Sequence, residues 1–247
     1  MLFSLLIGTA ALGTVALADT TALPSTVTVD GTAYTWKGAV AYGELDPTQP
    51  DTVTGYSLGG LGSAIAVKNW RRNTDGTYSG TILAQPDRGH NTVELENYGA
   101  RYQKISFTLN PCTANECNTD AANPSLSLTY EGGLEYVDTS PLNHNGGFTS
   151  GLDASTIRPA SGVFPELPAV LTSNGALSTD MEGIAFMADG SFWSSDEYGP
   201  AIYHLSPEGV IIGAIMPPDA FLPYNSDGNL DFSVEDGATL VSGRTTN

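Results

Sequence analysis

The chain has 247 residues, with 27 carboxylate side chains against 9 basic ones and a formal net charge of −18. Such a charge repels nucleic acid and anionic membranes, so we expect neither as a partner. The length suffices for one domain with a hydrophobic core.

The amino-terminal segment is uncharged and mostly apolar. Residues 1–18 end in Ala16-Leu17-Ala18, which is typical of a secretory signal peptide with a small-residue cleavage site. An uncleaved membrane anchor is the alternative, although the run is short for a bilayer span. We therefore expect a secreted chain whose domain occupies residues 19–247 and has no membrane contact once the signal is removed.

A first group of strand-like segments precedes residue 131. Apolar runs separated by turn residues predict four strands, at 62–67, 78–84, 101–109 and 126–130. Thr74-Asp75-Gly76 forms the first turn, and Asp87-Arg88-Gly89 follows the second strand. Four strands joined in sequence match one blade of a β-propeller.

Two cysteines lie between the last two of these strands. Cys112 and Cys117 enclose only four residues, and in a secreted protein such a pair favours a local disulfide. A two-cysteine metal site is the alternative, but further ligands with zinc-like spacing are missing nearby.

Residues 138–180 look like a long loop. Four prolines interrupt this stretch: Pro141, Pro159, Pro165 and Pro168. A structureless run of this length indicates a functional loop or a connection between blades.

A second group of strands follows. Ile184–Met187 is an apolar run, Asp189-Gly190 is a hairpin turn signal, and Ser191–Ser195 carries aromatic residues suited to a strand. Two further strands are expected at 201–205 and 210–215. The fold class is therefore predicted to be all-β and β-propeller-like, with a β-sandwich as the alternative.

Acidic residues gather at one end of the predicted hairpin. Because the first strand of a hairpin begins where the second ends, Asp180 and Glu182 should lie beside Asp196 and Glu197. Such a group repels itself unless it is protonated or holds a cation, and Ca²⁺ takes six to eight oxygen ligands. Asp87 could join from the first group of strands. The alternatives are a solvated acidic face and glutamates that accept backbone hydrogen bonds between blades.

Several short motifs resemble a known family. They are Glu182-Gly183, Asp196-Glu197-Tyr198-Gly199-Pro200, Pro217-Pro218-Asp219-Ala220-Phe221, Gly59-Gly60-Leu61-Gly62-Ser63-Ala64-Ile65 and Gln85-Pro86-Asp87-Arg88-Gly89-His90-Asn91-Thr92. With them the chain resembles the secreted, chiefly fungal branch of the phytase-like family described as "esterase-like activity of phytase". His90 stands where that family favours Trp. Residues 242–247 resemble the start of a further blade, so we expect an incomplete propeller that lacks its carboxy-terminal blades.

The resemblance implies a secreted, metal-assisted hydrolase of phosphate or carboxylic esters, with a small anionic ester as substrate and Ca²⁺ as cofactor. Glu182 and Glu197 would hold the ion, supported by Asp180 and Asp196. Arg88 would bind the anion.

The histidines and the nucleophile motifs leave a second hypothesis open. His90, next to Asp87-Arg88, is the candidate acid or base, whereas His144 is expected to be solvated and His204 to be packed or on the surface. Gly55-Tyr56-Ser57-Leu58-Gly59 matches Gly-x-Ser-x-Gly, but in an α/β-hydrolase that motif lies between a strand and a helix, and helical periodicity is weak everywhere beyond residue 18. The alternative function is therefore a non-catalytic secreted propeller that binds a ligand and holds a structural metal or none.

Overall fold

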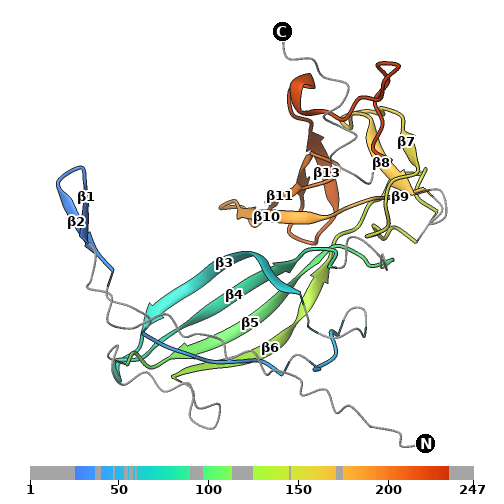
Figure 1. Ribbon diagram of the computed structural model, residues 1–247. Helices are drawn as coiled ribbons and strands as arrows, with labels where there is room; N and C mark the ends of the chain where they lie inside the picture. Colours follow the sequence, from blue (N-terminus) through green and yellow to red (C-terminus); the bar gives the residue numbers. More distant parts are fainter. Residues whose placement is uncertain are drawn as a thin grey trace, which may run out of the picture.

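The computed structural model (Figure 1) describes residues 26–36, 40–46, 48–52, 55, 58, 60–89, 97–112, 125–144, 146–170 and 175–233. Within these residues the protein is all-β, as predicted, and its sheets are antiparallel. One short 3-10 helix, η2, covers Asp219–Phe221. None of the helical segments described is long and apolar enough to cross a membrane. The expected signal peptide at 1–18, His90 and Cys117 lie outside the described residues.

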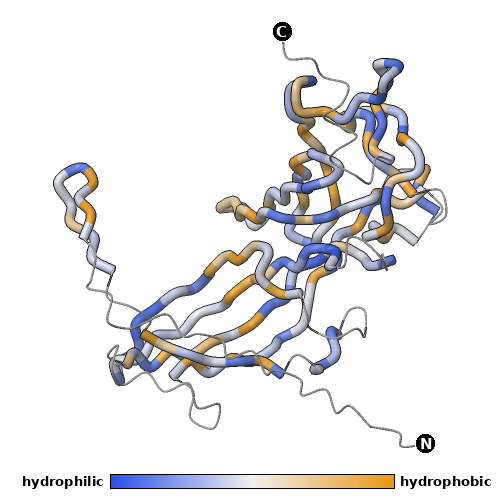
Figure 2. The backbone as a smooth tube through the Cα atoms, in the orientation of Figure 1, coloured by the Kyte–Doolittle hydropathy of each residue, from blue (hydrophilic) through white to orange (hydrophobic). Residues whose placement is uncertain are grey.

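The first sheet contains four strands in chain order, β3-β4-β5-β6. Their bounds are β3 Leu61–Arg72, β4 Tyr78–Pro86, β5 Arg101–Leu109 and β6 Leu126–Glu135. Burial alternates along β5 and the first part of β6, whereas β3 and β4 carry apolar runs at residues 64–67 and 82–84; Figure 2 shows hydrophobic stretches along the sheet. The four predicted strands are therefore confirmed, although β3 and β6 continue well beyond their predicted ends.

The second sheet repeats this connectivity, with the order β10-β11-β12-β13. Its strands are β10 Met181–Phe186, β11 Phe192–Asp196, β12 Ile202–Leu205 and β13 Ile211–Ile215. The Asp189-Gly190 turn joins β10 to β11, and Gly190 has a φ of 91°, which glycine adopts without steric cost. Both sheets thus have the strand order of a propeller blade, while their arrangement in an incomplete propeller stays a prediction.

The segment expected to be a long loop forms a third sheet. Its three strands are β7 Thr156–Arg158, β8 Leu167–Val170 and β9 Ala176–Leu177. The expectation of a loop was wrong here because the strands have only two to four residues and Pro168 lies inside β8, where sequence patterns argue against a strand. A separate hairpin, β1 Thr26–Val29 with β2 Thr32–Thr35, is exposed along its length and stands apart from the sheets (Figure 1).

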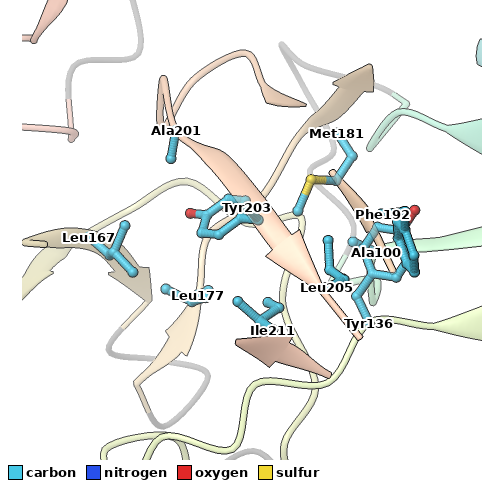
Figure 3. Packing of buried hydrophobic residues seen from close by; sticks show 10 residues of the cluster. All are labelled: Ala100, Tyr136, Leu167, Leu177, Met181, Phe192, Ala201, Tyr203, Leu205 and Ile211. Atoms are coloured by element: carbon cyan, nitrogen blue, oxygen red, sulfur yellow. The ribbon is translucent and has the colours of Figure 1, made fainter. Parts of the chain in front are cut away.

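The hydrophobic core lies against the inner face of the second sheet (Figure 3). Its buried members are Ala100, Tyr136, Leu167, Leu177, Met181, Phe192, Ala201, Tyr203, Leu205 and Ile211. Tyr102 of β5 packs edge-on against Phe186 and Phe192, with ring centroids 5.7 and 5.6 Å away. The first sheet is thereby packed against the turn end of the β10–β11 hairpin, and the acidic end of the hairpin contacts the first sheet separately, through Ser63 and Arg88.

Candidate metal centre

The register of the β10–β11 hairpin brings three carboxylates together. Met181 pairs with Asp196, and the amide of Glu197 donates a 2.9 Å hydrogen bond to the carbonyl of Asp180. Asp180, Glu182 and Glu197 each offer a carboxylate oxygen, and these oxygens all lie within 4.8 Å of one another. The acidic residues thus share one end of the hairpin, as the sequence predicts.

Glu182 occupies a β-bulge. Between the pairs Met181–Asp196 and Gly183–Ser195, β10 has one residue more than β11, and this extra residue is Glu182. Bulges redirect a side chain and are frequent beside functional sites. The next residue, Gly183, leaves room for the Ser195 hydroxyl, since a Cβ atom there would lie 2.5 Å from that oxygen and the hydroxyl would have to rotate away.

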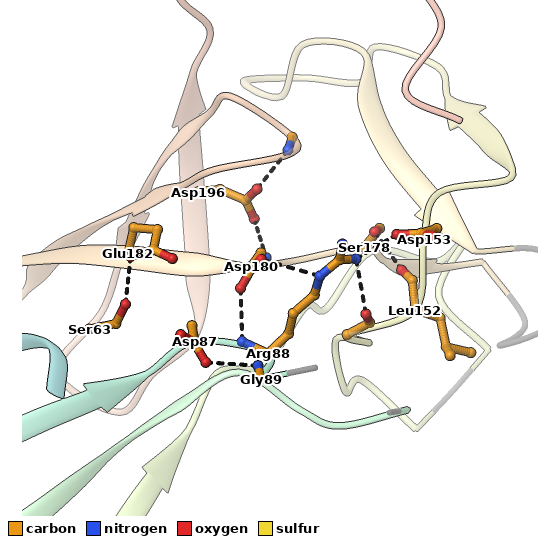
Figure 4. A network of polar contacts seen from close by, with 12 residues as sticks. Ser63, Asp87, Arg88, Gly89, Leu152, Asp153, Ser178, Asp180, Glu182 and Asp196 are labelled. Atoms are coloured by element: carbon orange, nitrogen blue, oxygen red, sulfur yellow. Dashed lines mark hydrogen bonds and ion pairs between the residues drawn. The ribbon is translucent and has the colours of Figure 1, made fainter. Parts of the chain in front are cut away.

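Asp180 is the buried member of the set. Its Oδ1 accepts a 2.8 Å hydrogen bond from the backbone amide of Arg88 (Figure 4). Its Oδ2 lies 3.2 Å from Arg88 Nε but accepts no hydrogen bond. Burial raises the pKa of this carboxyl to about 6. Oδ2 therefore has a cationic partner in Arg88 but no hydrogen-bond donor, so the cost of burying this carboxyl group in its charged form is only partly offset.

Asp196 supports the site through two hydrogen bonds to the backbone. One of its oxygens accepts the amide of Asp180 at 2.9 Å and the other accepts the amide of Gly199 at 2.7 Å. Burial raises the pKa of Asp196 to about 7. Its side chain therefore fixes the loop that carries Glu197 and lies outside the set of three carboxylates.

Arg88 is enclosed by the protein. Only 4% of the residue is exposed, and its NH1 donates to Asp153 Oδ1 at 2.6 Å and to the carbonyl of Gly151 at 3.2 Å. Its guanidinium carbon lies 4.2 Å from the centre of the Tyr198 ring. In this arrangement the guanidinium pairs with carboxylates of the protein, and binding a substrate anion would require it to leave them.

The remaining predicted site residues are placed differently. Asp87 is outside the set of three, and its Oδ1 accepts the amide of Gly89 at 2.7 Å. His144 is exposed, and His204 stacks on Trp193 with ring centroids 4.3 Å apart, both as expected. Cys112 is described, but Cys117 is not, so the disulfide stays a prediction.

Sequence reasoning missed two residues that contact the site. Ser63 donates a 2.5 Å hydrogen bond to Glu182 Oε2, and Asp153 pairs with Arg88. Ser63 lies within a motif that carries the family resemblance, yet the partners of Ser63 and Asp153 are 119 and 65 residues away along the chain. Gly62, directly before Ser63, was the one feature of the sequence that could have drawn attention to Ser63, since a glycine inside a strand often marks a bulge.

The chain belongs to the phytase-like family, because residues 58–244 match the family described as "Phytase-like: Esterase-like activity of phytase". A protein of the fungus Arthroderma benhamiae, named "Uncharacterized secreted protein", is 37% identical over 214 residues. That match covers 81% of this chain and 40% of the relative, so the chain spans less than half of the relative's length. No solved structure matches the chain.

The relative agrees with the location inferred from the amino-terminal sequence. Its printed name describes a secreted protein, and the chain is accordingly a secreted, all-β member of the phytase-like family.

Proposed function

We propose that the protein hydrolyses phosphate or carboxylic esters with the help of a divalent cation held by Asp180, Glu182 and Glu197. The observation that carries this is the group of three carboxylates, each with an oxygen within 4.8 Å of the others; its buried member, Asp180, has one oxygen, Oδ2, that accepts no hydrogen bond although Arg88 Nε lies 3.2 Å away. Membership of the phytase-like family supports ester hydrolysis as the activity.

The donor set fits a hard cation. All three side chains offer carboxylate oxygen, which Ca²⁺ prefers, and the partly exposed Glu182 and exposed Glu197 leave room for further ligands from water or substrate. When bound, such a cation would polarise a phosphoryl or acyl oxygen and favour attack by water. We therefore propose Ca²⁺ as the resident ion.

The protein is strongly acidic, so a bound cation would help it to bind an anionic substrate. The net charge of −18 repels phosphate and carboxylate groups over most of the surface. Because Arg88 is committed to Asp153 and Asp180, its role in this proposal is to hold Asp180 in place. A divalent ion among three carboxylates would reverse the local sign and receive a small anionic ester.

A second candidate is a binding protein in which the cation is structural. It is favoured by the location of the three carboxylates, because Asp180 and Glu182 are each hydrogen-bonded to residues of other parts of the fold, Arg88 and Ser63. A cation there would hold the sheets together without any turnover.

One assay separates the two candidates. The purified protein is incubated with phytate and with a p-nitrophenyl ester, in chelator and then in excess Ca²⁺. Hydrolysis that depends on Ca²⁺ and falls at least 100-fold in Glu182→Gln supports the enzyme. The control is Glu131→Gln on the exposed surface of β6, which removes the same charge and should keep full activity. Ca²⁺ binding without turnover of either substrate would favour the structural role, and full activity in chelator would contradict the metal-assisted reaction.

A further inference from the structure

Two β-bulges on different sheets face each other at the candidate metal centre. The bulge in β10 contains Glu182, as described above. In β3 the register jumps between the pairs Leu61–Pro86 and Ala64–Gln85, which leaves Gly62 and Ser63 as extra residues. Gly62 has a φ of 113°, a conformation that side chains rarely adopt, so glycine makes this bulge possible.

The two bulges are joined by one side-chain hydrogen bond. Ser63 Oγ donates to Glu182 Oε2 at 2.5 Å, across 119 residues of sequence (Figure 4). A carboxylate has two oxygens, so this bond leaves the other one for an ion. Figure 4 shows this second oxygen of Glu182 turned toward Asp180.

The backbone on either side of this contact is also fixed. Gln85, the residue paired with Ala64 directly after the first bulge, is fully buried and donates its Nε2 to the carbonyl of Gly183 at 3.1 Å. Gln85 Oε1 accepts hydrogen bonds from Ser194, at 2.9 Å, and from Tyr136. The carbonyl that follows Glu182 is thereby held against β4, so the remaining freedom at this position lies in the Glu182 side chain.

We propose that Ser63 is a positioning residue for the cation site. This inference rests on the proposed function, because it requires that Glu182 bind a cation. Ser63 holds Glu182 in the one orientation that presents an oxygen beside Asp180 and Glu197, before the ion arrives. Without this bond, the partly exposed side chain would sample other rotamers, and ordering it would oppose binding. Residues that orient metal ligands in this way change affinity 10- to 100-fold when they are replaced.

The test is calorimetric titration of the intact protein with Ca²⁺ alone, without substrate. Ser63→Ala should weaken binding about 10-fold, and Ser63→Thr, which keeps the hydroxyl, should restore most of it. Ser127→Ala, at an exposed serine on β6 of the same sheet, is the matched control and should bind as wild type does. Wild-type affinity in Ser63→Ala would overturn the inference. Absence of Ca²⁺ binding by the wild type would instead overturn the proposed function, so the two failures are distinguishable.

A double-mutant cycle shows whether Ser63 acts through Glu182. In a Glu182→Gln background, Ser63→Ala should change the remaining affinity less than two-fold, because the carboxylate that it positions is gone. An undiminished 10-fold effect in that background would show that Ser63 acts by another route. If Ser63→Ala melts too readily to titrate, Ser63→Val, which also lacks the hydroxyl and suits a strand, takes its place, and wild-type affinity in that variant would equally overturn the inference.

Discussion

Arg88 holds both carboxylate oxygens of Asp180, with its backbone amide 2.8 Å from Oδ1 and its side-chain Nε 3.2 Å from Oδ2. The two residues lie 92 positions apart in the sequence. Arg88 follows β4 of the first sheet and Asp180 precedes β10 of the second. This pair therefore fixes the position of the buried carboxylate and joins the two sheets at the same point.

Loss of the Arg88 side chain should destabilise the fold strongly. Arg88→Ala would leave Asp180 buried and both Asp153 and Asp180 without their counter-charge, which costs about 3 kcal/mol in buried pairs. Urea denaturation measures the change in unfolding free energy. Arg71→Ala, at an exposed position on β3, is the control and should cost less than about 0.5 kcal/mol. Equal stability of the two variants would show that the buried pairs contribute nothing.

Without divalent cations, the stability of the protein should fall as pH rises from about 5 to about 7 and then level off. Burial raises the pKa values of Asp180 and Asp196 from 3.8 to about 6 and about 7. Between these values and 3.8 the folded state binds more protons than the unfolded state, so ionisation opposes folding, by at most about 1.4 kcal/mol per pH unit for each proton.

Melting temperatures in chelator, measured at half-unit pH steps, test this dependence. Asp196→Asn should flatten the slope, although it loses one of the two acceptors that bind the amides of Asp180 and Gly199. Added Ca²⁺ should raise the melting temperature more at pH 8 than at pH 5, because the carboxyl groups bind Ca²⁺ only when they are deprotonated. A melting temperature that rises with pH in chelator would contradict the raised pKa values of Asp180 and Asp196.

Gly183 should not tolerate a side chain. Gly183→Ala places a Cβ atom 2.5 Å from the Ser195 hydroxyl oxygen, so either that hydroxyl rotates or the bulge that orients Glu182 shifts. We expect a loss of about 1–3 kcal/mol in unfolding free energy together with weaker Ca²⁺ binding. Ser195→Ala removes the hydroxyl, so the double variant should recover stability relative to Gly183→Ala. A double variant as unstable as Gly183→Ala would exclude this clash as the cause.

Ser191 should be dispensable for ester hydrolysis. Its hydroxyl lies 3.2 Å from His204 Nε2, which superficially resembles a nucleophile and base. However, Asp189 accepts from the Ser191 hydroxyl and amide, whereas in a catalytic triad the carboxylate orients the imidazole. The same turn recurs in the first sheet, where Asp75 accepts from the hydroxyl and amide of Thr77. Ser191→Ala should keep the rate on a p-nitrophenyl ester within two-fold, and a loss above 100-fold would identify a serine hydrolase.

Much of the fold follows from local sequence. The two four-stranded sheets were predictable because their strands carry apolar runs and end at recognisable turns such as Asp189-Gly190. The third sheet was not, since strands as short as Ala176–Leu177 are fixed by long-range packing and leave no periodic pattern.

The candidate site shows the same division. The proximity of Asp180, Glu182 and Glu197 could be deduced because a hairpin fixes which ends meet. The enclosure of Arg88 and the bond from Ser63 could not, because they depend on how one sheet packs against another. Sequence alone therefore assigned Arg88 to the substrate, whereas the structure pairs it with Asp153 and Asp180.

The most direct test of a cation held by Asp180, Glu182 and Glu197 is a crystal structure of the protein grown with Ca²⁺, with anomalous difference maps after replacement by Mn²⁺. We expect one peak bounded by all three carboxylates, with Ca²⁺–oxygen distances of about 2.3–2.6 Å. Crystals saturated with the ion that show no peak among these side chains, or a peak only elsewhere, would contradict the assignment.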